Sequence, residues 1–172
     1  MPPSANPEHL DVITFRRPTE DDYPTLVGLV DEWWGGRRIQ PMFQRVWFQH
    51  FSGTSWLAEL PDGRPAGFVV GFISPADPAV AYVHFVATNP NVRRQGLGRA
   101  LYERFFDDVA GRGVREVHSI TWPGNRVSVG FHLAMGFEPI GGAGSQNLYG
   151  TTAFADYDGP GEDRVHFSRR IG

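Results

Sequence analysis

Apolar and polar residues alternate through the middle of the chain in a way that predicts three consecutive strands. The runs SWLAEL at 55–60, AGFVVGFI at 66–73 and AVAYVHFVAT at 79–88 are rich in β-branched and aromatic residues. Turn-forming residues separate them, PDGR at 61–64 and SPADP at 74–78. Because short connections of this kind join antiparallel neighbours, we expect an antiparallel meander.

Helical spacing and capping signals occur on both sides of this meander. From Leu97 to Val109 an apolar residue recurs every four positions, which places these side chains on one face of a helix. Thr19 with Asp22 resembles a capping box, and Asn125 is suited to an N-cap. The first expected helix runs from the capping box to Glu32, where WWGGRR at 33–38 ends it. Two further helices are expected over 41–51 and over 97–109. A fourth runs from Asn125 to Met135, with Gly136 as its C-cap.

Further strands complete the predicted sheet. The segments 12–19, 115–121 and 164–171 have strand character, and another strand begins at Phe137. The region 142–163 is rich in glycine and aspartate, and we expect a long surface loop there that includes part of a strand. The fold class predicted from this order is α/β (α+β), with helices flanking a mixed, largely antiparallel central sheet.

Length and composition fit one globular domain. The chain has 172 residues, of which 41% are hydrophobic and 20% charged. We assign residues 11–172 to this domain, and the polar, proline-rich residues 1–10 to a disordered arm. No apolar run resembles a signal peptide or a membrane span, so we expect a cytoplasmic protein that does not bind membranes.

Charge and residue usage exclude several kinds of chemistry. The net charge of −3 provides no general attraction for nucleic acid. The absence of cysteine removes disulfides, thiolate metal sites and a cysteine nucleophile, and no histidines have the spacing of metal ligands. We therefore expect no metal. All 16 basic residues are arginine, so no mechanism that requires lysine applies.

The stretch VRRQGLGRALYERFF at 92–106 combines glycines and arginines where a helix begins. Backbone amides at a helix start point outward unpaired, and the helix dipole adds a positive potential there. Glycines let a phosphate approach the backbone, and arginines add charge-assisted hydrogen bonds. The stretch predicts a cradle for a phosphate or pyrophosphate, formed by Arg93, Arg94, Gln95, Gly96, Leu97, Gly98 and Arg99.

Three kinds of phosphate-binding turn compete for this pattern. A Walker A loop requires Gly-Lys-Ser/Thr, which a chain without lysine cannot supply. A dinucleotide fingerprint requires a third glycine where Leu101 stands, and it prefers a parallel strand context. The third kind is a pyrophosphate site for coenzyme A.

Two motifs resemble those of the GNAT superfamily of N-acetyltransferases. Arg93-x-x-Gly96-x-Gly98 follows a strand that ends in VATNP at 86–90, and NRVSVGFHLAMGF at 125–137 resembles the next motif of that family. The resemblance implies an enzyme with acetyl-CoA as co-substrate, attacked directly by an amine in a ternary complex, and we expect a bacterial protein. It also implies contacts to the cofactor from the backbone of Val86, Ala87 and Thr88 and from Asn125, Ser128 and Phe131.

The same resemblance points to candidates for proton transfer. The base of this superfamily is often a Glu or His on the central strand; His84 occupies such a position, and Glu59 is the next candidate. The acid is often a tyrosine four residues before the glycine of the second motif, where this chain has His132. An imidazolium can donate a proton to a thiolate. The alternatives are that a neighbouring carbonyl satisfies His84 and that His132 lines the cofactor cleft.

The acceptor is less well defined by sequence. Trp33, Trp34 and Phe43 lie in the first helical pair, where this superfamily builds part of its acceptor pocket, although such residues also pack helices against sheets. We expect an N-acetyltransferase for a small-molecule or peptide amine. The alternatives are a non-catalytic acetyl-CoA-binding module and an enzyme that acylates a hydroxyl. Small domains often form homodimers, and we expect one here.

Overall fold

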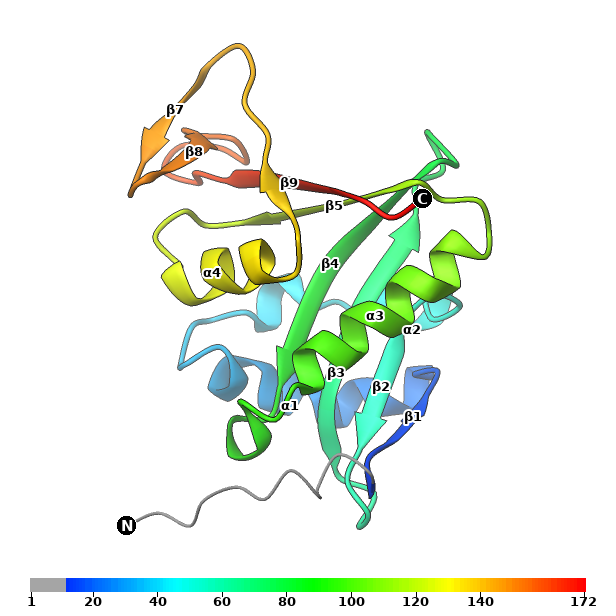
Figure 1. Cartoon of the computed structure of the whole chain (residues 1–172). Helices are drawn as coiled ribbons and strands as arrows, with labels where there is room; N and C mark the ends of the chain where they lie inside the picture. The colour runs from blue at the N-terminus through cyan, green and yellow to red at the C-terminus, as the bar shows by residue number, and fades with distance from the viewer. Residues whose placement is uncertain (1–11) are drawn as a thin grey trace. The chain divides into compact units, whose positions relative to one another are not determined.

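The structure is a computed structural model that describes residues 12–172 (Figure 1). The predicted arm at 1–10 lies outside the described residues. Two compact units make up the described chain: residues 12–72 with 85–109, and residues 73–84 with 110–172. We call them the first and second unit and describe each by itself.

The order of elements follows the prediction closely. In chain order they are β1 (Thr14–Arg16), η2 (Glu20–Asp22), α1 (Tyr23–Trp33), η3 (Gln40–Met42), α2 (Val46–His50), β2 (Trp56–Glu59), β3 (Pro65–Ile73), β4 (Val80–Thr88), η4 (Pro90–Val92), α3 (Leu97–Ala110), β5 (Glu116–Thr121), α4 (Arg126–Ala134), β6 (Glu138–Pro139), β7 (Ser145–Leu148), β8 (Thr151–Phe154) and β9 (Val165–Arg170).

Strand pairing confirms the predicted fold class. The seven-stranded sheet has the order β1-β2-β3-β4-β5-β9-β6, and β7 and β8 form a separate two-stranded sheet. The pairs β1–β2, β2–β3, β5–β9 and β6–β9 are antiparallel, whereas β4 and β5 are parallel. A parallel pair needs a long crossover, and α3 supplies it.

In the first unit, helices cover both faces of the strands. Phe68 of β3 belongs to a buried cluster with Val30 of α1 and Phe43, so α1 packs on that face. The neighbouring residue Gly67 points to the opposite face, where a Cβ atom would lie 3.3 Å from Leu97 of α3. The first unit is therefore a layer of strands between α1 and α3.

In the second unit, α4 packs on β5 and β9. His132 of α4 stacks on Phe167 of β9 at 4.9 Å between ring centroids, and Phe137 contacts the same imidazole edge to face. Val117 of β5 and Val165 of β9 complete a core in which each of these apolar side chains is at most 2% exposed. This packing fixes the start of α4 relative to β5.

Two predicted elements differ in the structure. The helix expected over 41–51 is divided into η3 and α2, because Phe43 leaves helical geometry at φ −91° and ψ 80° and is fully buried. The loop expected over 142–163 contains the β7–β8 hairpin, whose turn residues Tyr149 and Gly150 have φ of 54° and 86°. Positive φ at both turn positions suits a tight hairpin.

Within residues 12–172, no helix is both long enough and apolar enough to cross a membrane.

Candidate active site

The start of α3 has the geometry expected of an anion cradle. The turn before it reverses sharply, with φ of 65° at Arg94 and 80° at Gly96. The amide of Ala100 donates to the carbonyl of Gly96 at 3.0 Å, so the helical hydrogen bonds begin there. By helix geometry the amides of Leu97 and Gly98 have no carbonyl partner inside the helix, and they lie at the positive end of its dipole.

Close packing holds this helix start in place. Leu97 and Leu101 are at most 2% exposed. A Cβ atom on Gly67 would lie 2.8 Å from the backbone oxygen of Ala87 and 3.2 Å from Leu101. Only glycine therefore lets β3, β4 and α3 approach this closely. Sequence analysis did not single out Gly67, although a glycine inside a predicted strand signals close backbone approach.

The arginines of the turn have different partners. Arg93 donates from Nε to the carbonyl of Thr88 at 3.3 Å and from Nη2 to the carbonyl of Trp33. Arg99 is half exposed and lies 3.7 Å from Glu103, one turn further along α3. The side chain of Arg93 is thus bound to the protein backbone, and a contact of this residue with phosphate stays a prediction.

Gln95 is a further polar residue of the turn. Within residues 12–172 its buried Oε1 atom has no hydrogen-bond partner. A buried polar atom without a partner at a ligand turn is expected to gain one on binding. Oε1 only accepts, so its partner must be a donor and not a phosphate oxygen. The amides, the helix dipole and the positive charge of the turn fit a phosphate-bearing group such as that of coenzyme A.

His84 lies on β4, two residues before the Val86–Thr88 segment. Its imidazole is half-buried and lies 6.2 Å from the ring of Tyr82, measured between centroids. Burial lowers the pKa of His84 from 6.5 to about 4, so the ring is neutral near neutral pH. Burial also raises the pKa of the Tyr82 phenol, with Asp158 adding to the effect.

The second motif forms a hydrogen-bonded helix start. Asn125 accepts from the amide of Ser128 at 3.2 Å, which confirms the predicted N-cap. One turn later, Nδ1 of His132 lies 2.8 Å from the Ser128 carbonyl, and Nε2 lies 3.1 Å from Oγ of Ser119. Phe131 is half-buried beside this imidazole, at 5.9 Å between ring centroids.

These contacts determine the state of the His132 ring. A carbonyl only accepts, so Nδ1 carries a proton, and in the neutral ring Nε2 then accepts from the Ser119 hydroxyl. Burial lowers the pKa of His132, while the bond to the Ser128 carbonyl opposes the shift. The ring is therefore neutral, 3% exposed and bonded through both nitrogens. No sequence signal linked Ser119 to His132, because the pairing depends on how α4 packs on β5.

The remaining predicted residues lie in the first unit. Glu59 accepts from Nη2 of Arg16 at 2.7 Å, and the same guanidinium binds Asp22. Phe43 is fully buried, and Trp33, which is 4% exposed, stacks on Phe68. The structure thus gives Glu59 an ionic partner and places two of the three aromatic residues proposed for the acceptor in the core.

Trp34 is the member of this aromatic group that keeps partial exposure. Its indole contacts the rings of Phe68 and Phe85 at 6.2 and 6.0 Å between centroids. It follows directly after the last residue of α1, in the turn that leads to η3. Trp34 is therefore the one of the three predicted acceptor aromatics that is not fully buried.

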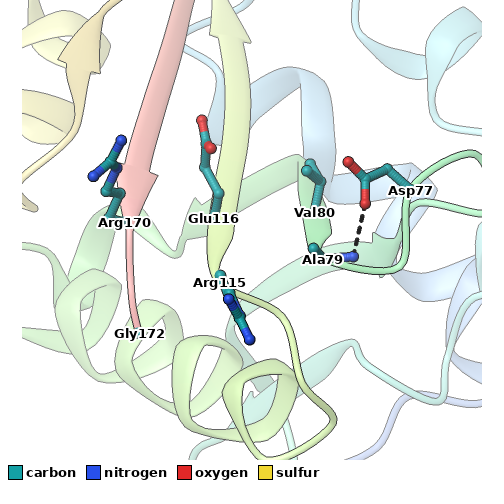
Figure 2. Close-up of a pocket in the computed structure, with 7 residues that line it drawn as sticks. All are labelled: Asp77, Ala79, Val80, Arg115, Glu116, Arg170 and Gly172. Carbon is teal, nitrogen blue, oxygen red and sulfur yellow. Dashed lines mark hydrogen bonds between the residues drawn. The ribbon is translucent and has the colours of Figure 1, made fainter.

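The second unit also contains a cavity of about 360 Å³ between the ends of its strands. Figure 2 shows Arg115 and Glu116 at the start of β5 and Arg170 at the end of β9, with Asp77 accepting from the Ala79 amide at 2.9 Å. None of the residues predicted for the active site lines this cavity. Within residues 12–172, no group of three or more His, Cys, Asp or Glu side chains is arranged to hold a metal ion.

Comparison with known proteins identifies the family. The sequence model of the Acetyltransferase (GNAT) family matches residues 18–137, which is more than half of the chain. The chain belongs to the GNAT acetyltransferase family. The match includes both motifs that resemble this family, at the start of α3 and in α4.

Several similar sequences carry the same name. The chain is 33% identical over 115 residues to the L-2,4-diaminobutyric acid acetyltransferase of Nocardia farcinica, covering 67% of this chain and 59% of that protein. It is 32% identical over 130 residues to the protein of the same name from Streptomyces coelicolor, covering 74% and 73%. The chain thus spans less than two thirds of the length of the Nocardia relative.

Solved structures share the GNAT fold. Diaminobutyrate acetyltransferase from Paenibacillus lautus, in complex with L-2,4-diaminobutyric acid and coenzyme A, superposes with a TM-score of 0.66 at 22% identity, covering 93% of this chain and 96% of that one. The ribosomal-protein-S18-alanine N-acetyltransferase of Escherichia coli gives 0.70 at 20% identity, covering 93% and 94%. At these identities the likeness shows the fold.

Proposed function

We propose that this chain is an acetyl-CoA-dependent N-acetyltransferase whose acceptor is a small diamino acid of the L-2,4-diaminobutyrate type. The observation that carries the proposal is the start of α3, where the turn at Arg94 and Gly96 leaves helix amides open to an anion. Relatives that share 30–33% identity and are named for this acceptor support the choice of substrate class.

The cofactor would be held mainly by the first unit. In this proposal the amides from Arg94 to Arg99 bind its pyrophosphate, with Arg99 adding positive charge, and the backbone of Val86–Thr88 orients its acyl carbonyl. When bound, acetyl-CoA supplies a thioester carbon that is open to attack by an amine. A fixed amide aimed at the developing oxyanion is worth a few kcal/mol in a site that excludes water.

His84 is the base in this proposal. A neutral imidazole can accept the proton of the attacking amine, and burial keeps the ring neutral from about pH 4 upward. Glu59 is a weaker candidate because Arg16 already neutralises its carboxylate. The bonds of both His132 nitrogens favour a role without proton transfer, in which the ring holds α4 against β5 and so positions the second motif.

A thiol-release assay tests the activity. Acetyl-CoA is offered with L-2,4-diaminobutyrate, with 2-aminobutyrate, which lacks the distal amine, and with 4-aminobutyrate, which lacks the α-amine. We expect release of free coenzyme A and a product 42 mass units heavier, about one acetyl group, only with an acceptor that carries the correct amine. The pattern across the three compounds identifies the amine that reacts.

Acetyl-CoA binding separates the enzyme from the non-catalytic alternative. At 100 times its Kd, acetyl-CoA stabilises the fold by about 2.7 kcal/mol whether or not turnover follows. A thermal shift without thiol release, for any amine or alcohol tested, would support the binding module. Absence of a thermal shift contradicts both. The homodimer and the cytoplasmic location stay predictions, checked by light scattering and by fractionation of cells.

A further inference from the structure

The guanidinium of Arg93 connects two backbone segments that are distant in sequence. One acceptor is the carbonyl of Thr88, the last residue of β4, and the other is the carbonyl of Trp33, the last residue of α1. All three residues belong to the first unit. Arg93 also opens the turn that forms the cofactor cradle, so a single side chain joins the cradle to the end of α1.

The end of α1 is well suited to hold this guanidinium. The last carbonyls of a helix have no partner inside it and lie at the negative end of its dipole. A planar guanidinium presents several donors in fixed directions and so can bind two carbonyls at once. Replacing it by a shorter or single donor would release one of the two segments.

The turn after α1 is itself held together by several hydrogen bonds. Asp31 accepts from the amides of Ile39 and Gln40 at 2.7 and 2.9 Å, and the amide of Gly36 donates to the carbonyl of Asp31 at 2.8 Å. Trp34 in this turn packs on Phe85 of β4. A shift at Trp33 would therefore be passed to the segment 34–40 as a whole.

We propose that Arg93 is a positioning residue that couples the cofactor cradle to the α1–η3 turn at residues 34–40. The inference rests on the proposed function and on the prediction that Trp34, which lies in this turn, contacts the acceptor. Binding of acetyl-CoA restricts the cradle, Arg93 transmits the restriction to the end of α1, and the acceptor meets a turn that is already ordered. Coupling of this kind typically changes affinity by about 5- to 150-fold.

Hydrogen exchange with and without coenzyme A tests the coupling in the absence of any acceptor. In the wild-type protein, coenzyme A should slow exchange both at 94–100 and at 34–40. In Arg93→Gln it should slow exchange at 94–100 alone. The contrast variant is Arg94→Gln, which removes a charge from the same turn: it should weaken binding of coenzyme A but retain the slowing at 34–40 at saturation. Equal slowing at 34–40 in Arg93→Gln and wild type would overturn the coupling.

Kinetics with the acceptor supply a second readout. If Arg93 acts through the α1–η3 turn, Arg93→Gln raises the KM of the acceptor by roughly tenfold, within the usual range of such coupling. If Arg93 instead binds phosphate, only the KM of acetyl-CoA rises. Arg93→Lys keeps the charge but not the two-pronged geometry, so it should leave the KM of acetyl-CoA near the wild-type value and the acceptor KM high. Full rescue of both constants by lysine contradicts the proposal.

The two tests separate this inference from the proposed function. If coenzyme A binds and slows exchange at 34–40 through Arg93 while no amine is acetylated, the coupling stands and the proposed activity fails. If amines are acetylated but exchange at 34–40 does not respond in the wild type, the activity stands and the coupling fails. If coenzyme A does not bind the wild-type protein, both fail. Arg93→Lys also guards against misfolding of the glutamine variant.

Discussion

The buried imidazole of His84 makes a quantitative prediction about the dependence of stability on pH. Burial lowers its pKa in the folded protein from 6.5 to about 4. As the pH falls through 6.5, the unfolded chain binds a proton at His84 and the folded protein does not. Because the unfolded state then binds more protons, the free energy of unfolding must decrease as the pH falls, until the folded pKa is reached.

The size of the effect follows from the two pKa values. At about 1.36 kcal/mol per pH unit, the interval from 6.5 to about 4 corresponds to about 3 kcal/mol in total. About 2 kcal/mol of this is already lost at pH 5, where the unfolded histidine is almost fully protonated and the folded one is not. Such a loss is a large part of the stability of an ordinary domain.

Urea denaturation at pH 7.5 and at pH 5.0 measures this term when wild type is compared with His84→Gln. Glutamine is similar in length and does not titrate, so the variant should lose about 2 kcal/mol less between the two pH values. Burial also lowers the pKa of His132 and His166, but both proteins share these groups and the difference cancels them. Equal losses in the two proteins would show that folded His84 titrates normally and would refute the reasoning.

Three further predictions concern packing and capping. Gly67→Ala should lower the free energy of unfolding by about 1–3 kcal/mol and weaken acetyl-CoA binding, because its Cβ meets the backbone of Ala87 at 2.8 Å. The control Gly28→Ala has open space around it and should stabilise α1 by about 0.5–1 kcal/mol in the same thermal melts. Unchanged stability in Gly67→Ala contradicts the close approach. His132→Phe keeps a ring against Phe167 but loses both hydrogen bonds, so it should lower the free energy of unfolding while kcat stays close to the wild-type value. A large loss of kcat would instead support the acid role. Asn125→Ala should cost about 1 kcal/mol in urea denaturation, and no cost would mean that the cap is not important in solution.

The sequence by itself determined the parts of this protein that depend on neighbouring residues. Capping at Asn125 and the apolar face from Leu97 to Val109 are local patterns, and the structure contains the helices they predicted. The turn before α3 is local as well, since glycine at 96 and the helix start define an anion cradle within a few residues. For this reason the family and its cofactor motif could be predicted before any tertiary contact was known.

Tertiary structure decided what each side chain of these motifs contacts. Arg93 forms a hydrogen bond to the carbonyl of Trp33, 60 positions earlier in the chain, and His132 forms one with Ser119 of β5. Phe43 leaves the helix predicted for it because a fully buried position among aromatic rings outweighs a weak local helix preference. Hydrogen bonds and burial across the fold are absent from any local pattern. Sequence could therefore predict a cofactor turn, but only packing shows that its first arginine binds backbone carbonyls.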